Sequence, residues 1–166
     1  MSIRKTVIVS LFVCFSMALY AFETILPPIL MVPGAKIGLS NIVTMVSMVI
    51  LGRKEAFMIL FIRIFLVSLL FGQIVSLSFS LSGAIFSFVI MALLVKWFSN
   101  ECLYIVGIFG AIFHNFGQII IAFLITKSAS VFYYFPFMFL IAIPTGLLTG
   151  FSSYFCIKLI RKIKII

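Results

Sequence analysis

The sequence predicts an all-α integral membrane protein, a single domain over residues 1–166 folded as a bundle of six transmembrane helices. Of the 166 residues, 65% are hydrophobic and 9% are charged, and the mean hydropathy is +1.41. These values lie far outside the range of soluble globular proteins. A membrane span needs about 20 mostly apolar residues, so the length accommodates about six spans with short connections and no separate soluble domain.

The apolar runs set the expected helices in order. The first run is too long for the apolar region of a secretory signal, so it is assigned to a helix. The second helix has Ser40 as its N-cap and covers only about 18 Å of a hydrocarbon core about 30 Å thick. The expected helices span Thr6–Leu26, Ser40–Leu51, Ala56–Phe71, Phe79–Val95, Leu103–Thr126 and Phe132–Leu159.

The segment Pro27–Asn41 lies between the first two helices and is broken by prolines and glycines, which interrupt a continuous helix. It is too apolar for a solvent loop and must complete the short second crossing. Irregular backbone at membrane depth is tolerated where it is buried in protein or lines a cavity. Such interrupted segments point to the binding site of transporters. A tight turn between two spans is the alternative.

Small residues predict close helix packing at two places. In the first helix, Ser10, Cys14 and Ala18 recur at every fourth position and suit either the bundle's own packing or a partner subunit. The fourth helix carries a second group, Ser80, Ser82, Gly83, Ala84 and Ser87.

The net charge of +9 reflects membrane orientation rather than nucleic-acid binding. Nine of the twelve Lys and Arg residues fall in four segments that six spans place on one side. Because cytoplasmic loops are enriched in Lys and Arg, both termini are expected in the cytoplasm of a multi-pass protein of the cell membrane. The broken segment then faces outside.

Arg63 lies near the middle of the third expected helix, too deep for easy snorkelling to the interface. A guanidinium at the bilayer centre costs about 2.5–3.5 kcal/mol even on the translocon scale, so it requires a partner or a polar cavity. Two interpretations are open, an anion contact and a structural ion pair with Glu23.

His114, Asn115 and Gln118 fall within one turn of the fifth helix. His114 and Gln118 share a face at the i, i+4 spacing, and Asn115 lies about 100° away. Three polar side chains in one turn favour a pocket wall over a single interhelical hydrogen bond.

The remaining polar candidates belong to the outer side of the bundle. Together with Arg63 they predict a cavity with more cationic than anionic groups, suited to a carboxylate, a phosphate or another polar ligand. Glu23 on its own is expected to be a solvated acid at the interface. The candidate substrate-binding residues are Lys36, Asn41, Arg63, His114, Asn115, Gln118, Glu23 and Gln73.

The chain lacks the residues that several kinds of catalytic and metal-binding site require. The chain has no aspartate, and its three acids are Glu23, Glu55 and Glu101, so an Asp-rich magnesium site has no basis. The three cysteines form no Cys-x-x-Cys pair, and neither a P-loop nor a serine-hydrolase elbow occurs. No catalytic residue, metal site or cofactor is predicted.

A set of short motifs resembles the Gx transporter family, also named heptaprenyl diphosphate synthase component I. The resemblance covers roughly Glu23 to Ile125, and it depends on the combination and order of the motifs. The motifs are Pro33–Asn41, Gly52–Ala56, Arg63 followed by Leu70–Gly72, Ser80–Gly83 and His114–Gln118.

This resemblance implies a six-helix membrane protein similar to the substrate-binding S components of energy-coupling factor (ECF) transporters. In that scheme a separate coupling subunit and two ATPases supply the energy. The older name implies a non-catalytic component of isoprenoid or menaquinone synthesis beside a soluble prenyltransferase subunit. Three hypotheses follow: a solute-binding transporter subunit, a membrane component that holds a prenyl diphosphate, and a bundle whose polar residues are purely structural.

Overall fold

The computed structural model describes residues 3–25, 38–71, 74–98 and 100–163. Within these ranges the chain forms α-helices and two short 3₁₀ helices, with no strand. The elements are α1 (Ile3–Ile25), α2 (Leu39–Ile50), α3 (Arg53–Phe71), α4 (Ile74–Leu94), η1 (Asn100–Cys102), α5 (Leu103–Thr126), η2 (Ala129–Tyr134) and α6 (Phe135–Lys162).

Four stretches are long and apolar enough to cross a membrane, which makes the chain a multi-pass helical membrane protein. They are Ile3–Ile25, Leu77–Leu94, Leu103–Thr126 and Ala129–Lys162. Helix α2 is apolar but has only 12 residues. Helix α3 has 19 residues but carries charges at its first three positions and again at Arg63. The number of α-helices agrees with the prediction, although α2 and α3 do not qualify as spans on length and composition.

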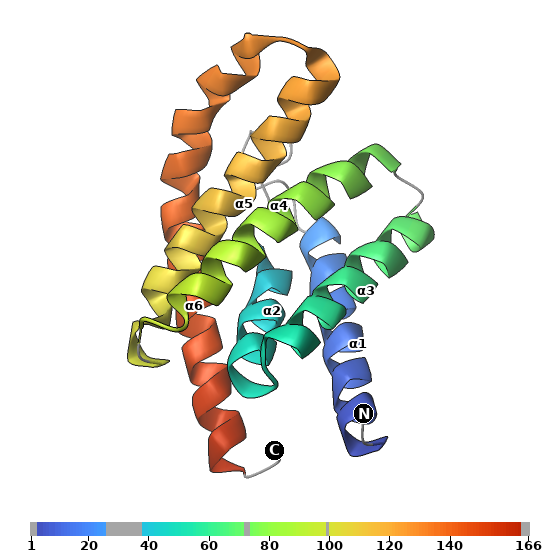
Figure 1. Cartoon of the computed structure of the whole chain (residues 1–166), viewed down its shortest axis with the longest axis vertical. Coiled ribbons are helices and arrows are strands. Elements are labelled where there is room, and N and C mark those ends of the chain that lie inside the picture. The colour runs from blue at the N-terminus through green and yellow to red at the C-terminus, as the bar shows by residue number, and fades with distance from the viewer. Residues whose placement is uncertain (1–2, 26–37, 72–73, 99, 164–166) are drawn as a thin grey trace.

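Helix α2 lies between two groups of helices (Figure 1). On one side α5 and α6 form a long antiparallel pair, and α4 runs beside α5. On the other side α1 and α3 pack against each other and against α2. Every residue from Ile42 to Met48 is buried, so the short helix is enclosed by its neighbours. The predicted short second helix is confirmed.

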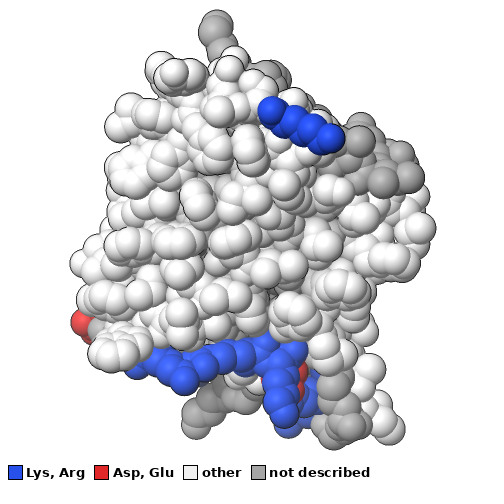
Figure 2. All heavy atoms as spheres, turned by 45° about the horizontal axis from the view of Figure 1, so that its top comes forward, with Lys and Arg blue, Asp and Glu red and all other residues white. Residues whose placement is uncertain are grey.

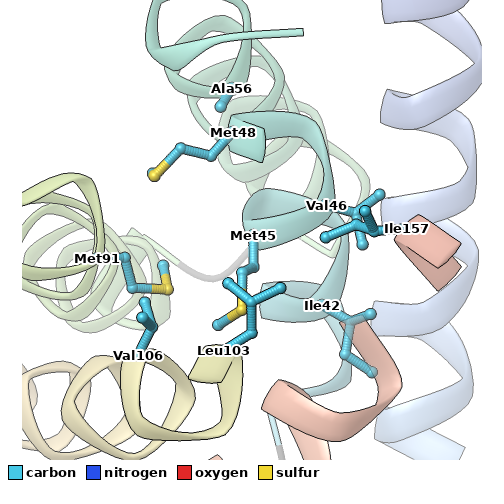
Figure 3. Close-up of a cluster of buried hydrophobic side chains, with 9 residues drawn as sticks. All are labelled: Ile42, Met45, Val46, Met48, Ala56, Met91, Leu103, Val106 and Ile157. Atoms are coloured by element: carbon cyan, nitrogen blue, oxygen red, sulfur yellow. The ribbon is translucent and has the colours of Figure 1, made fainter. Parts of the chain in front are cut away.

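The largest buried cluster surrounds α2 and joins it to α4, α5 and α6 (Figure 3). Met45 lies among Met91, Leu103 and Val106, and each of these side chains is at most 1% exposed. Methionine fills irregular gaps well because its side chain is unbranched and flexible. In a bilayer, van der Waals packing of this kind is a main force that holds helices together, since lipid tails are as apolar as the side chains.

Glycines bring the backbones of α5 and α6 into contact. A Cβ atom on Gly107 would lie 2.3 Å from the carbonyl oxygen of Gly146, and one on Gly150 would lie 2.4 Å from Cα of Tyr104. Helices α4 and α5 are also close, because Ser82 Oγ donates a hydrogen bond to the carbonyl oxygen of Gly117 at 2.8 Å. The close packing predicted for the small residues of the fourth helix is therefore confirmed.

The boundaries of four predicted helices were wrong. Helix α1 begins at Ile3 rather than Thr6. Helix α3 begins at Arg53 rather than Ala56, because Arg, Lys and Glu are good helix formers and Glu55 in the first turn complements the partial positive charge of the helix N-terminus. Helix α4 begins at Ile74 rather than Phe79, and α6 runs from Phe135 to Lys162 after a 3₁₀ turn. At α2 the N-cap is Gly38 with φ +80°, and it makes no side-chain cap. Ser40 is therefore inside the helix.

The small residues Ser10, Cys14 and Ala18 lie on an exposed side of α1. The opposite side carries the buried residues Val9, Val13 and Ser16, which face the other helices. The described bundle therefore does not use the stripe for its own packing.

The charged ends of several helices meet at one end of the bundle. Lys5 of α1 forms an ion pair with Glu55 of α3, and both chain termini lie at this end (Figure 1). Lys and Arg side chains form a band along the same edge, whereas the broad face above it is almost uncharged (Figure 2). This segregation of charge is the pattern that positive-inside orientation produces.

Candidate functional site

A cavity of about 60 Å³ lies between α1, α2, α3, α4 and α5. At 10–15 Å³ for each water, this is room for about four to six water molecules. Among the described residues, its walls carry one cationic and one anionic side chain together with hydroxyl, amide and imidazole groups. The lining residues are Tyr20, Glu23, Gly38, Ser40, Asn41, Arg63, Ile64, Val67, Ser68, Leu77, Ser80, His114 and Gln118. We call this the charged cavity.

Arg63 supplies the cation of the charged cavity and is only 5% exposed. It lies ten residues after the charged end of α3, about 15 Å along the helix. Its Nη1 donates to Ser16 Oγ at 3.4 Å, a long hydrogen bond, and no other hydrogen bond is described for this side chain. Arg63 forms no ion pair with Glu23, so the structural ion pair left open by the sequence is wrong.

Glu23 supplies the anion and is 8% exposed. Its Oε1 accepts a hydrogen bond from the backbone N–H of Gly38 at 2.6 Å, at the residue that precedes α2. A carboxylate is favoured there because the N-terminal end of a helix carries a partial positive charge. The prediction that Glu23 is a solvated acid at the interface is therefore wrong. Glu23 is buried and connects the end of α1 to the start of α2.

His114 and Gln118 both line the charged cavity, as their i, i+4 spacing predicts. Gln118 is 8% exposed, and its Oε1 is buried without a hydrogen-bond partner. Gly83 of α4 makes room for the imidazole, since a Cβ atom at that position would lie 2.9 Å from Cε1 of His114. An unpartnered buried acceptor is costly, and a donor on a bound molecule would satisfy it.

Asn115 belongs to a second, smaller cavity of about 20 Å³ that we call the neutral cavity. The two cavities share Gly38, Asn41 and His114 in their walls, so they adjoin. Asn115 Nδ2 also donates to the carbonyl oxygen of Met138 at 2.9 Å, which joins α5 to α6. Its offset from His114 and Gln118 around the helix explains why it lines the other cavity.

Five of the eight predicted residues thus line the charged cavity, Asn115 lines the neutral one, and Lys36 and Gln73 lie outside the described residues. Two further residues of the site were not predicted from the sequence: Tyr20, which lines the charged cavity, and Ser16, which accepts the hydrogen bond from Arg63. With Glu23 they recur at the i, i+4, i+7 spacing of one helix face, and that pattern was available in the sequence.

The fold and the site define a class, an α-helical multi-pass membrane protein with a buried polar cavity that holds both signs of charge. A family model described as heptaprenyl diphosphate synthase component I matches residues 12–156, and the chain belongs to that family. The family resemblance drawn from the motifs is confirmed. The family name denotes one component of a synthase and so implies another subunit. No curated protein and no solved structure matches the chain at a significant level.

Proposed function

We propose that this chain is the substrate-binding membrane subunit of a transporter in the cell membrane, similar to an ECF S component, and that it takes up a small polar, anionic solute. The observation that carries the proposal is the environment of Arg63. Arg63 is 5% exposed, and its guanidinium lines the charged cavity and makes one long hydrogen bond to Ser16. A buried guanidinium is costly unless further acceptors satisfy it, and a carboxylate or phosphate would supply them.

The size and the remaining walls of the charged cavity support a small solute. A volume of about 60 Å³ suits a compact molecule rather than a long prenyl chain. Gln118 and His114 would fix its orientation through hydrogen bonds, since both lie in the same wall. Transport requires an energy source and a partner, for which an ECF coupling subunit with its ATPases is the expected choice.

The substitution Arg63→Leu tests this function. Loss of a charge-assisted hydrogen bond costs about 1.5–3 kcal/mol, so binding of the solute should weaken roughly 10- to 150-fold. Native mass spectrometry of the protein purified from cells should show a bound small-molecule mass on the wild type that is absent from the variant. Arg53→Leu is the matched control, because this exposed arginine lies at the charged end of the same helix. Retention of the bound mass by a monodisperse Arg63→Leu variant would refute the assignment.

The family match favours a second candidate, a non-catalytic membrane component of heptaprenyl diphosphate synthase. In that case Arg63 would bind the diphosphate, and a soluble, aspartate-rich prenyltransferase subunit would carry out catalysis, since this chain has no aspartate. Affinity purification from the native membrane separates the two candidates. A coupling subunit with ATPases supports the transporter, whereas co-purification of a prenyltransferase supports the synthase.

A further inference from the structure

The charged cavity contains two buried, oppositely charged side chains that do not bind each other. Glu23 and Arg63 are 8% and 5% exposed and line the same small space, yet they form no ion pair. Among the described lining residues they are the carboxylate and the guanidinium of the site, and their formal charges sum to zero.

Separate hydrogen bonds hold the two groups on different helices. Glu23 Oε1 accepts from the N–H of Gly38 at 2.6 Å, and Arg63 Nη1 donates to Ser16 Oγ at 3.4 Å. Attraction between opposite charges grows strongly in a medium of low dielectric constant, so two buried charges that stay apart are unusual without something between them. A bound molecule that carries both charges would satisfy both groups.

The position of Glu23 also disfavours a solute that is only an anion. A carboxylate or phosphate at Arg63 would lie in the same 60 Å³ space as the carboxylate of Glu23, and two like charges in a desolvated site repel. A second positive group on the solute removes this repulsion. Gln118 Oε1, buried and unpartnered in the same wall, offers one more acceptor for its N–H donors.

We propose that the solute is a small zwitterion of the amino-carboxylate class, with its carboxylate on Arg63 and its ammonium between Glu23 and Gln118. This inference depends on the proposed solute-binding function, and it replaces a purely anionic solute by one that carries a positive group as well.

Chemical blocking of each charge tests the proposal with the purified full chain in lipid nanodiscs. Thermal shift and native mass spectrometry would screen the twenty protein amino acids, and each binder would be compared with its N-acetyl derivative and its amide. N-acetylation removes the positive charge, and amidation removes the negative one. At least one amino acid should bind, and each blocked derivative should bind at least tenfold more weakly.

The substitution Glu23→Gln should reduce the preference for the amino acid over its N-acetyl derivative at least tenfold. The glutamine carbonyl can still accept the Gly38 hydrogen bond, so the connection between α1 and α2 is kept. Glu55→Gln is the matched control, because Glu55 pairs with Lys5 at the charged end and should leave the preference unchanged. If Glu23→Gln fails to fold, the comparison of the amino acid with its blocked derivatives on the wild-type protein still tests the zwitterion proposal.

Two results would overturn the zwitterion. One is binding of N-acetyl derivatives or simple anions to the wild type at least as tightly as any amino acid. If that binding is lost in Arg63→Leu, the solute-binding function survives without the zwitterion. The other is absence of binding by every amino acid. If the wild-type protein also carries no co-purified mass, both proposals fail together.

Discussion

Hydroxyl groups that face other helices differ in whether their oxygen has a described hydrogen-bond partner. Ser82 Oγ joins α4 to Gly117 of α5, and Ser153 Oγ donates to the carbonyl oxygen of Thr149 at 2.7 Å. Ser87 and Thr44 are each 1% exposed, and their hydroxyl oxygens have no described partner. Ser87 lines the neutral cavity, so its hydroxyl makes that space polar.

The substitutions Ser87→Ala and Ser82→Ala should therefore have different effects, although both positions lie on α4. Loss of the Ser82 hydrogen bond should lower the free energy of unfolding by about 0.5–1.5 kcal/mol. Removal of the unpartnered Ser87 hydroxyl should be neutral or slightly stabilising. Reversible unfolding in mixed micelles measures both variants against the wild type. An equal loss in the two variants would contradict the hydrogen-bond assignment.

At the level of elements, the α5–α6 pair depends on direct backbone contact. A Cβ atom on Gly146 would lie 2.4 Å from Cα of Ile108 and 2.7 Å from the carbonyl oxygen of Gly107. Backbone cannot move aside as a flexible side chain can, so the helices would have to separate. By contrast, a Cβ atom on Gly110 would meet the side chain of Met91 at 2.9 Å.

We expect Gly146→Ala to be much more damaging than Gly110→Ala. Overpacking typically costs about 1–3 kcal/mol, and the higher values are expected where backbone blocks relaxation. Met91 can adopt another rotamer, so Gly110→Ala should cost less than about 1 kcal/mol. Thermal unfolding of the two purified variants measures the difference. Similar melting temperatures for both would mean that the contact between α5 and α6 is looser than described.

The sequence predicted the helices better than it predicted their contacts. Apolar length was enough to locate the long helices and the short α2, and the i, i+4 rule placed His114 and Gln118 in one wall. The burial of Glu23 was not predictable from the sequence, because it depends on where α1 ends relative to Gly38, fifteen residues further on. Likewise, no local sequence pattern indicates that Ser16 of α1 accepts a hydrogen bond from Arg63 of α3.

For the whole molecule, the distribution of charge predicts its orientation in the membrane. The band of Lys and Arg lies at the end that contains both termini (Figures 1 and 2). Lys127 is the residue that caps the C-terminal end of α5. Helix α5 has 24 residues and is about 36 Å long, enough to cross a hydrocarbon core of about 30 Å. Because cytoplasmic segments are enriched in Lys and Arg, we expect the charged band to face the cytoplasm and the turn between α5 and η2 to face outside.

Cysteine labelling in intact cells tests this orientation. Cys14, Cys102 and Cys156 would first be replaced by alanine, and one exposed position would then be changed, Ser130→Cys at the outer turn or Lys162→Cys at the charged end. A membrane-impermeant maleimide should label Ser130→Cys from outside. It should reach Lys162→Cys only after permeabilisation, because basic segments are retained in the cytoplasm. The reverse labelling pattern would mean that the bundle has the opposite orientation in the membrane. The charged cavity would then have to take up its solute from the cytoplasmic side.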